Sequence, residues 1–119
     1  MTAADIRALV YRVYEAINAK DFVAMKELFA PYCVSHALED AGIENGEEML
    51  KQVSEAFPDQ RFVVEDVLVD GDKAALRVTI HGVPQQPLPI IMEIFRIEKG
   101  QVAEVWGAGT LRWPVSNKG

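Results

Sequence analysis

The sequence predicts an α+β fold in which a curved antiparallel sheet forms a cone over three N-terminal helices, a cystatin-like α+β roll. Apolar residues recur at helical spacing through the first half of the chain, and the period changes to two from residue 61 onward. Two long apolar runs, 88–97 and 102–111, flank a four-residue turn that carries Gly100, which is typical of a hairpin. Helices followed by strands indicate the α+β class, and 119 residues fit one domain, residues 1–119.

The first predicted element is an amphipathic helix over residues 3–19. Thr2 and Asp5 have the spacing of a capping box at its start. Its apolar stripe consists of Ile6, Leu9, Val10, Val13 and Ile17. A second, short helix begins at residue 22, and we expect Pro31 to end it.

The segment after Pro31 is predicted to be short and extended over residues 32–38, because it is rich in residues that favour strands. Residues 39–46 are polar and predict a loop. Asn45 is expected to cap a third helix, with Glu48 at the third position of its capping box. The Pro-Asp pair at residues 58–59 then ends that helix.

Four strands are predicted to follow as a meander, over residues 61–69, 73–83, 88–97 and 102–111. The remaining tail, residues 113–119, is expected to be a loose end. An antiparallel sheet that covers three helices must curl and enclose a cone. Binding pockets tend to lie in such concavities, so we expect one here.

The composition argues against several classes of function. The net charge is -6 and no run of five like charges occurs, which argues against nucleic acid or an anionic membrane as a partner. No stretch approaches about 18 consecutive apolar residues, so no membrane span is expected. The single cysteine, Cys33, cannot form an internal disulfide, which suits a cytoplasmic protein. With two histidines, no cluster at ligand spacing and no glycine-rich phosphate loop, we expect neither a metal nor a cofactor.

Three segments carry a resemblance to a known family: YEAINAKDFVAMKELFAPYCVSHAL, FPDQRFVVEDVLVDGDKAALRVTIHG and IFRIEKGQVAEVWGAG. They resemble the nuclear transport factor 2-like superfamily and, within it, the SnoaL-like polyketide cyclases. The resemblance spans residues 6–110 and implies the cone fold. In these cyclases an acidic residue directly follows the tryptophan of the last strand, whereas here Gly107 follows Trp106.

The related ketosteroid isomerases place a base, a tyrosine and a protonated acid in the cavity. The position of the base falls on Ala37, and the position of the tyrosine falls on Val13, next to Tyr14. The position of the protonated acid falls on Glu93, which is the one match of the three. The resemblance therefore implies a functional acid at Glu93 and argues against steroid isomerisation.

Glu93 and His36 are the predicted catalytic residues. Glu93 lies within an apolar strand, and an apolar wall around it would raise its pKa, so that it could donate or accept a proton. His36 lies on the predicted segment at the mouth of the cone, where it could form an acid/base pair with Glu93. Alternatively, Glu93 is paired with Arg77 or Arg96 at the sheet, and His36 is a partly exposed loop residue.

Tyr14 and Tyr32 could offer a hydroxyl to a carbonyl ligand, although a core or rim position is equally open for Tyr14. The predicted binding wall further comprises Val78, Ile80, Phe95, Val105, Gly107 and Gly109. The two glycines leave one face of the last strand without side chains, which favours a hollow over a solid core.

Met92, Ile94 and Trp106 point away from Glu93 and the glycines by alternation, so the outer face of the sheet is apolar as well. A sheet that is apolar on both faces needs a cover on both. Helices cover the inner face, and we predict that a second copy of the chain covers the outer one in a homodimer.

The pattern favours a cofactor-free enzyme of the cyclase or isomerase type, which transfers a proton on a hydrophobic carbonyl compound. Glu93 would move the proton, and His36 or a tyrosine would stabilise the developing enolate. One alternative is a non-catalytic module that binds an apolar small molecule, which Gly107 in place of an acid favours. The other is a dimerisation domain, which a filled cone would favour.

Overall fold

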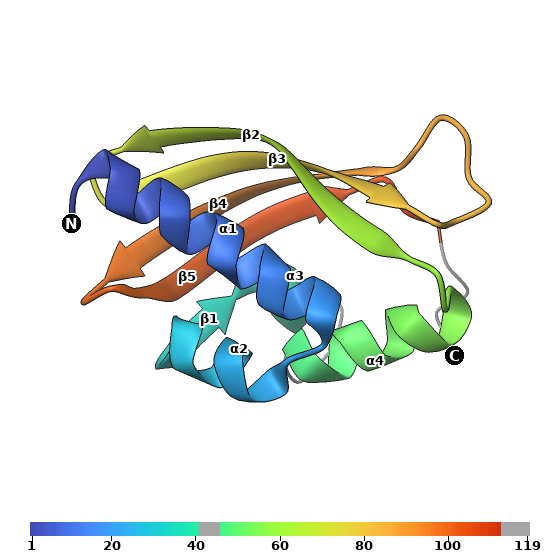
Figure 1. Cartoon of the computed structure of the whole chain (residues 1–119), viewed down its shortest axis with the longest axis horizontal. Coiled ribbons are helices and arrows are strands. Elements are labelled where there is room, and N and C mark those ends of the chain that lie inside the picture. Colours follow the sequence, from blue (N-terminus) through green and yellow to red (C-terminus); the bar gives the residue numbers. More distant parts are fainter. Residues whose placement is uncertain (41–45, 113–119) are drawn as a thin grey trace.

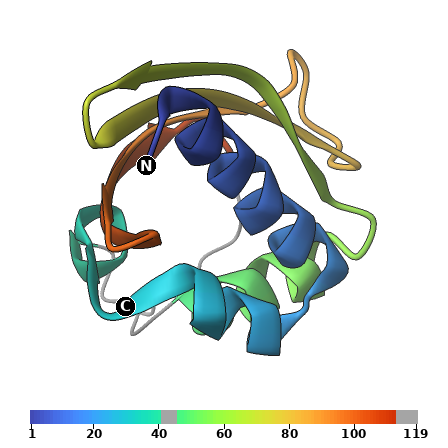
Figure 2. The same ribbon diagram turned by 60° about the vertical axis from the view of Figure 1, so that its left-hand side comes forward.

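The structure is a computed structural model that describes residues 1–40 and 46–112. The chain order of the elements is α1 (Ala3–Ala19), α2 (Phe22–Leu28), β1 (Phe29–Ser35), α3 (His36–Asp40), α4 (Gly46–Ala56), β2 (Arg61–Asp70), β3 (Lys73–His81), β4 (Ile90–Glu98) and β5 (Gln101–Gly109). The strands form one layer that curves over α1 (Figure 1). Turned by 60°, the sheet is seen to arch around α1, while α2 and α4 lie on the side away from the arch (Figure 2). The predicted α+β cone is therefore confirmed.

The sheet has five strands in the order β1-β5-β4-β3-β2. Strands β2 to β5 form the predicted antiparallel meander, and β1 adds to its edge in parallel with β5. The prediction of a purely antiparallel four-stranded sheet is thus wrong at this edge. Strand β1 pairs with β5 at Phe29 and again at Val34 and Ser35, with a register shift between them. Because this pairing is irregular, the sequence of β1 lacks the regular alternation by which a strand is recognised.

The expected end of the second helix at Pro31 is also wrong. Helix α2 ends at Leu28, and Phe29 already has extended backbone dihedrals of −102° and 138°. Pro31 lies instead within β1, in the irregular stretch between the paired residues. An edge strand tolerates proline there because the missing N–H is not needed for the ladder.

Residues 36–40 form the short helix α3, and not the extended end or the loop that the sequence predicts. Helix α4 begins at Gly46 and ends at Ala56, as the Pro-Asp stop predicts. The expected cap of this helix, Asn45, lies outside the described residues, as does the tail 113–119.

The core forms between the predicted stripe of α1 and the inner face of the sheet. Ile6, Leu9, Val10 and Val13 are almost completely buried, as are Leu76, Val78 and Ile80 of β3. The predicted capping box at Thr2 and Asp5 is present. Near the other end of α1, the Asn18 side chain donates to the carbonyl of Phe62 and accepts from its N–H, which fixes the helix against β2. The position of α1 over the sheet is therefore set at both apolar and polar contacts.

Candidate active site

The inner face of the sheet and the helices enclose a cavity of about 630 Å³. Its lining is mainly apolar and includes Ile17, Phe22, Met25, Leu50, Ile91 and Phe95. Among the polar lining residues, Tyr14 and Glu93 are deeply placed and Lys26 is exposed at the rim. The volume and the few polar groups are those of a typical small-molecule site.

Glu93 reaches the cavity from the middle of β4. Its neighbours Ile91 and Phe95 also line the cavity, while Met92 and Ile94 are exposed on the outer face of the sheet. This is the two-residue alternation of a strand, and the sequence predicts this orientation. Protein atoms surround the carboxyl group of Glu93. The residue still keeps some accessible surface, because it borders the cavity.

Tyr14 meets Glu93 inside the cavity. The Tyr14 hydroxyl donates a hydrogen bond to Oε1 of Glu93. Tyr14 is buried on the sheet side of α1, where its ring also makes an edge contact with Phe62 at 6.0 Å between centroids. The hydroxyl that faces the acid therefore comes from Tyr14, one position after the residue onto which the isomerase resemblance places it.

Burial gives both groups of this pair an unusual protonation behaviour. Burial raises the pKa of Glu93 from 4.5 to about 7, and the hydrogen bond from Tyr14 opposes that rise. Burial, followed by the charge and the hydrogen bond of Glu93, raises the pKa of Tyr14 well above 10. Tyr14 is therefore a neutral donor at all ordinary pH values, whereas Glu93 changes its charge near neutrality.

Gly107 makes room for the Glu93 side chain. The two residues are direct partners in the β4–β5 ladder, so that they share the inner face of the sheet. A Cβ atom at Gly107 would lie 3.0 Å from Cγ of Glu93 and 3.3 Å from the carbonyl oxygen of Met92. Gly109 stands in the same way beside Ile91. Neither glycine lines the cavity itself, so the prediction that they form part of its wall is wrong. They lie beneath side chains that line it.

His36 lies on the outer face of the sheet, so the predicted acid/base pair of His36 and Glu93 is wrong. Its Nε2 is 2.7 Å from Oε2 of Glu104, and its ring stacks on Trp106 with centroids 5.3 Å apart. Glu104 and Trp106 flank Val105 in β5, and Val105 is the residue that lines the cavity. The physical reason is the register of β1, which pairs Val34 with Glu104 and Ser35 with Val105, so that His36 comes next on the side of Trp106.

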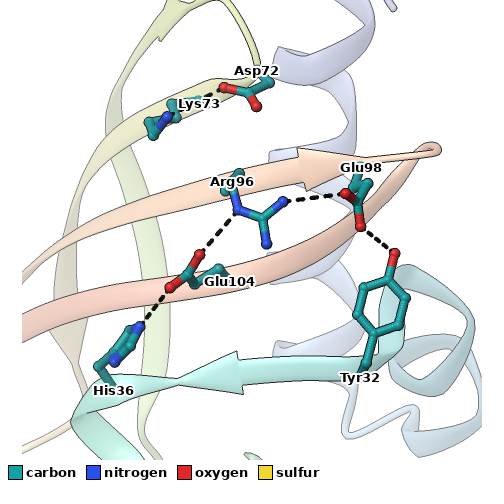
Figure 3. A network of polar contacts seen from close by, with 7 residues as sticks. All are labelled: Tyr32, His36, Asp72, Lys73, Arg96, Glu98 and Glu104. Carbon is teal, nitrogen blue, oxygen red and sulfur yellow. Dashed lines mark hydrogen bonds and ion pairs between the residues drawn. The ribbon is translucent and has the colours of Figure 1, made fainter.

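Tyr32 is also outside the cavity, contrary to its predicted role as a ligand donor. It is 53% exposed, and its hydroxyl donates to Oε1 of Glu98. A single outer network joins His36, Glu104, Arg96, Glu98 and Tyr32 (Figure 3). Arg96 lies at its centre, with Nε 3.0 Å from Oε1 of Glu104. The network ties β1 and α3 to β4 and β5.

The proposed arginine partners of Glu93 are engaged elsewhere. Arg96 belongs to the outer network, and Nε of Arg77 is 2.7 Å from Oδ2 of Asp66 on the outer face.

Two predicted wall residues, Val78 and Ile80, are fully buried in the core beneath α1 and do not line the cavity.

Several lining residues lie on helices, and the sequence gives no signal that assigns them to the site. Met25 of α2 and Leu50 of α4 lie on apolar faces of their helices, and the structure shows that both border the cavity. Lys26 was not singled out at all. Periodicity identifies an apolar face but not how much of it a neighbouring element covers, so the available signal was incomplete.

Three further properties concern the described part of the chain. No helix there is long and apolar enough to cross a membrane. Nor do the described residues include a group of three or more His, Cys, Asp or Glu side chains placed to hold a metal ion. The Cys33 thiol lines the cavity, and burial, the largest cause, raises its pKa.

A curved sheet closed by helices around an apolar cavity defines the cone-shaped α+β class. Within this class, the chain belongs to the SnoaL-like domain family, whose model matches residues 10–105. No curated protein sequence matches the chain.

Solved structures share the fold. IdmH of Streptomyces antibioticus, a proposed polyketide cyclase, is 25% identical with a TM-score of 0.71, over 87% of this chain and 90% of that one. A proposed polyketide cyclase of Bacillus cereus is 18% identical with a TM-score of 0.79, over 90% and 75% of the two chains. A proposed ketosteroid isomerase of Kribbella flavida is 19% identical with a TM-score of 0.68, over 98% and 82%.

Proposed function

We propose that the protein is a cofactor-free enzyme of the cyclase or isomerase type, which transfers a proton on a hydrophobic carbonyl compound held in the cavity. Glu93 carries the proton, and Tyr14 stabilises the oxygen that becomes negative. The observation that supports this most strongly is the Glu93 carboxyl, which burial brings to a pKa of about 7 beside a neutral hydroxyl donor. A pKa near the working pH suits a group that must accept and then return a proton.

The pair can act in two steps. Ionised Glu93 removes a proton from the carbon next to the carbonyl group, so that the C–H bond breaks, an O–H bond forms on Glu93, and the electron pair moves to the carbonyl oxygen as an enolate. The neutral Glu93 then needs the Tyr14 hydrogen bond less than its carboxylate did. Tyr14 can therefore donate to the enolate oxygen when that oxygen gains charge, which is the electrostatic stabilisation that enzymes use for developing oxyanions. In a cyclisation, the enolate carbon then attacks a second carbonyl carbon of the ligand, and Glu93 returns its proton to the alkoxide that forms. In an isomerisation, the enolate is conjugated with a C=C bond, and Glu93 returns its proton to the far carbon of that system.

The family supports the same type of chemistry. Its structural neighbours include proposed polyketide cyclases and a proposed ketosteroid isomerase. The acid that the cyclase resemblance expects at Gly107 is absent, but Glu93 is its direct ladder partner on the same face. A carboxyl group thus occupies the same region of the inner sheet surface from the neighbouring strand.

Exchange of carbon-bound hydrogen in deuterated water tests proton transfer without knowledge of the natural substrate. A panel of hydrophobic ketones and 1,3-diketones is incubated with the protein, and loss of the α-proton signal is followed by NMR. We expect Glu93→Gln to lower the exchange rate by roughly 10²- to 10⁴-fold, the usual contribution of a general base. Glu98→Gln, on the outer face of the same strand, is the matched control and should leave the rate unchanged. Equal exchange by the wild type and Glu93→Gln would exclude Glu93 as the proton carrier.

A second candidate function is a binding module that holds an apolar ligand without turnover. Gly107 in place of an acid favours it, because Glu93 is then the one carboxyl group at the buried end of the cavity, and Tyr14 occupies one of its oxygens. Tight binding of a ketone from the panel with no exchange above the solvent rate would select this candidate.

We also propose a homodimer through the outer face of the sheet. Ladder partners Leu68, Ala75, Ile94 and Trp106 form an apolar row across four strands. Leu68 is 71% exposed and Ile94 is 41% exposed, so the row is open to a partner. Outward-facing charges border the row on both sides, with the Arg77–Asp66 pair on one and Arg96 and Glu104 on the other. Such a surface can match a second copy of itself across a two-fold axis.

A further inference from the structure

The helical side of the cavity mouth carries positive charge, although the chain as a whole has a net charge of -6. Lys26 of α2 lines the cavity itself. Lys20 and Lys51 line an adjoining hollow of about 330 Å³, which shares Phe22 and Leu50 with the cavity wall. One lysine therefore lines the cavity, and two more line a hollow that shares part of its wall.

The charges at this mouth do not cancel completely. Glu47 also lines the cavity, but its Oε2 is 3.0 Å from Nζ of Lys51, so these two charges neutralise each other. Glu55 and Lys20 both line the adjoining hollow, and their charges are opposite. The Lys26 ammonium makes no hydrogen bond or ion pair with any residue in the described ranges 1–40 and 46–112. Among the described residues, one cation at the mouth is thus left without a partner.

The cavity consequently has two different polar ends. Tyr14 and Glu93 form the buried end, where a neutral carbonyl group fits, and Lys26 forms the exposed end. The wall between them is apolar, with Met25 and Phe29 among the residues nearest in sequence to Lys26. An apolar ligand that enters this cavity leaves its outer end beside the Lys26 ammonium, with which no residue of the described ranges pairs.

We infer that Lys26 binds a carboxylate at the outer end of the ligand, so that the cavity takes hydrophobic keto acids rather than neutral ketones. One unpaired ammonium group matches one singly charged carboxylate, because lysine acts as a point charge. A phosphate, with more charge and more acceptor oxygens, would require further cations. The carbonyl end rests on the proposed function, whereas the carboxylate end can be tested by binding alone.

Two probes that differ in the carboxylate alone test this inference. The probes are 4-oxo-4-phenylbutanoate and its methyl ester, and their Kd values are measured by calorimetry with the wild type and two variants. We expect Lys26→Gln to raise the Kd of the acid about fivefold and leave that of the ester unchanged, which is the upper range for a solvent-exposed ion pair. Lys73→Gln, an exposed lysine on β3 away from the cavity, should change neither value. Added salt should weaken binding of the acid to the wild type but not to Lys26→Gln.

Three results would overturn the inference. The first is an unchanged Kd of the acid in Lys26→Gln, and the second is an equal loss of acid and ester, as expected if Lys26 merely stabilises the last turn of α2. The third is failure of the wild type to bind either probe. Glu93→Gln separates this inference from the proposed function, because it should lower the exchange rate of the α-protons while the preference for the acid over the ester remains.

Discussion

Replacement of Tyr14 by phenylalanine should raise the pKa of Glu93. The Tyr14 hydroxyl donates to the Glu93 carboxylate, and this hydrogen bond lowers a pKa that burial has raised to about 7. A hydrogen bond to a charged group contributes roughly 1.5–3 kcal/mol, and each pH unit of pKa corresponds to about 1.4 kcal/mol. The neutral acid keeps part of that interaction in the wild type, so the expected rise in Tyr14→Phe is roughly one to two pH units.

The assay is a pH titration of the Glu93 side-chain carboxyl by ¹³C NMR, with the signal assigned by its loss in Glu93→Gln. Tyr11→Phe is the matched control, because Tyr11 lies on the same helix and is 44% exposed. It should leave the titration unchanged. An unchanged or lower pKa in Tyr14→Phe would refute the reasoning, since the hydroxyl would then not stabilise the carboxylate.

Three further predictions follow from the site and the sheet. The folded-state pKa of Glu93 lies above its ordinary value of 4.5, so the stability that its protonated form contributes is complete below pH 4.5 and is lost as the pH rises to about 7. In urea unfolding, Glu93→Gln should therefore gain about 2–3 kcal/mol of stability relative to the wild type between pH 5 and pH 8. A difference in stability that does not depend on pH would contradict this. Gly107→Ala should lower the free energy of unfolding by about 1–3 kcal/mol, because the new Cβ contacts Cγ of Glu93. The loss should be much smaller in a Glu93→Ala background, and a double-mutant cycle measures this difference. Sedimentation at micromolar concentration should give twice the chain mass of 13.2 kDa, and Ile94→Lys should give the monomer, whereas a monomeric wild type would remove the dimer.

The sequence predicts the four-strand meander and the orientation of Glu93 because strand periodicity is a local property. Side chains alternate with a period of two, so the position of Glu93 among Ile91 and Phe95 suffices to place it with them on one face. The same local rule places Met92 and Ile94 on the outer surface. No information about distant parts of the chain is needed for either conclusion.

The site itself depends on contacts between distant elements, which the sequence does not display. Tyr14 lies at the border of the apolar stripe of α1, and its contact with Glu93, 79 positions later, depends on how α1 crosses the sheet. His36 follows an edge strand with an irregular register and opens a helix of five residues. A segment this short has too few residues for periodicity to assign a face, and a shift of one residue moves every side chain of a strand to the other side.

The relation between Glu93 and Gly107 explains how the acid can change strands without a change of fold. Ladder partners on one face of an antiparallel pair have Cβ positions about 4.5–5.5 Å apart, so a carboxyl group on either strand reaches the same region of the cavity. The space there admits one such side chain, because a Cβ at Gly107 would already touch Cγ of Glu93. An acid on β4 therefore requires a very small residue opposite it on β5. The glycine that removes the expected cyclase acid is, on this argument, the condition for the acid that the cavity does contain.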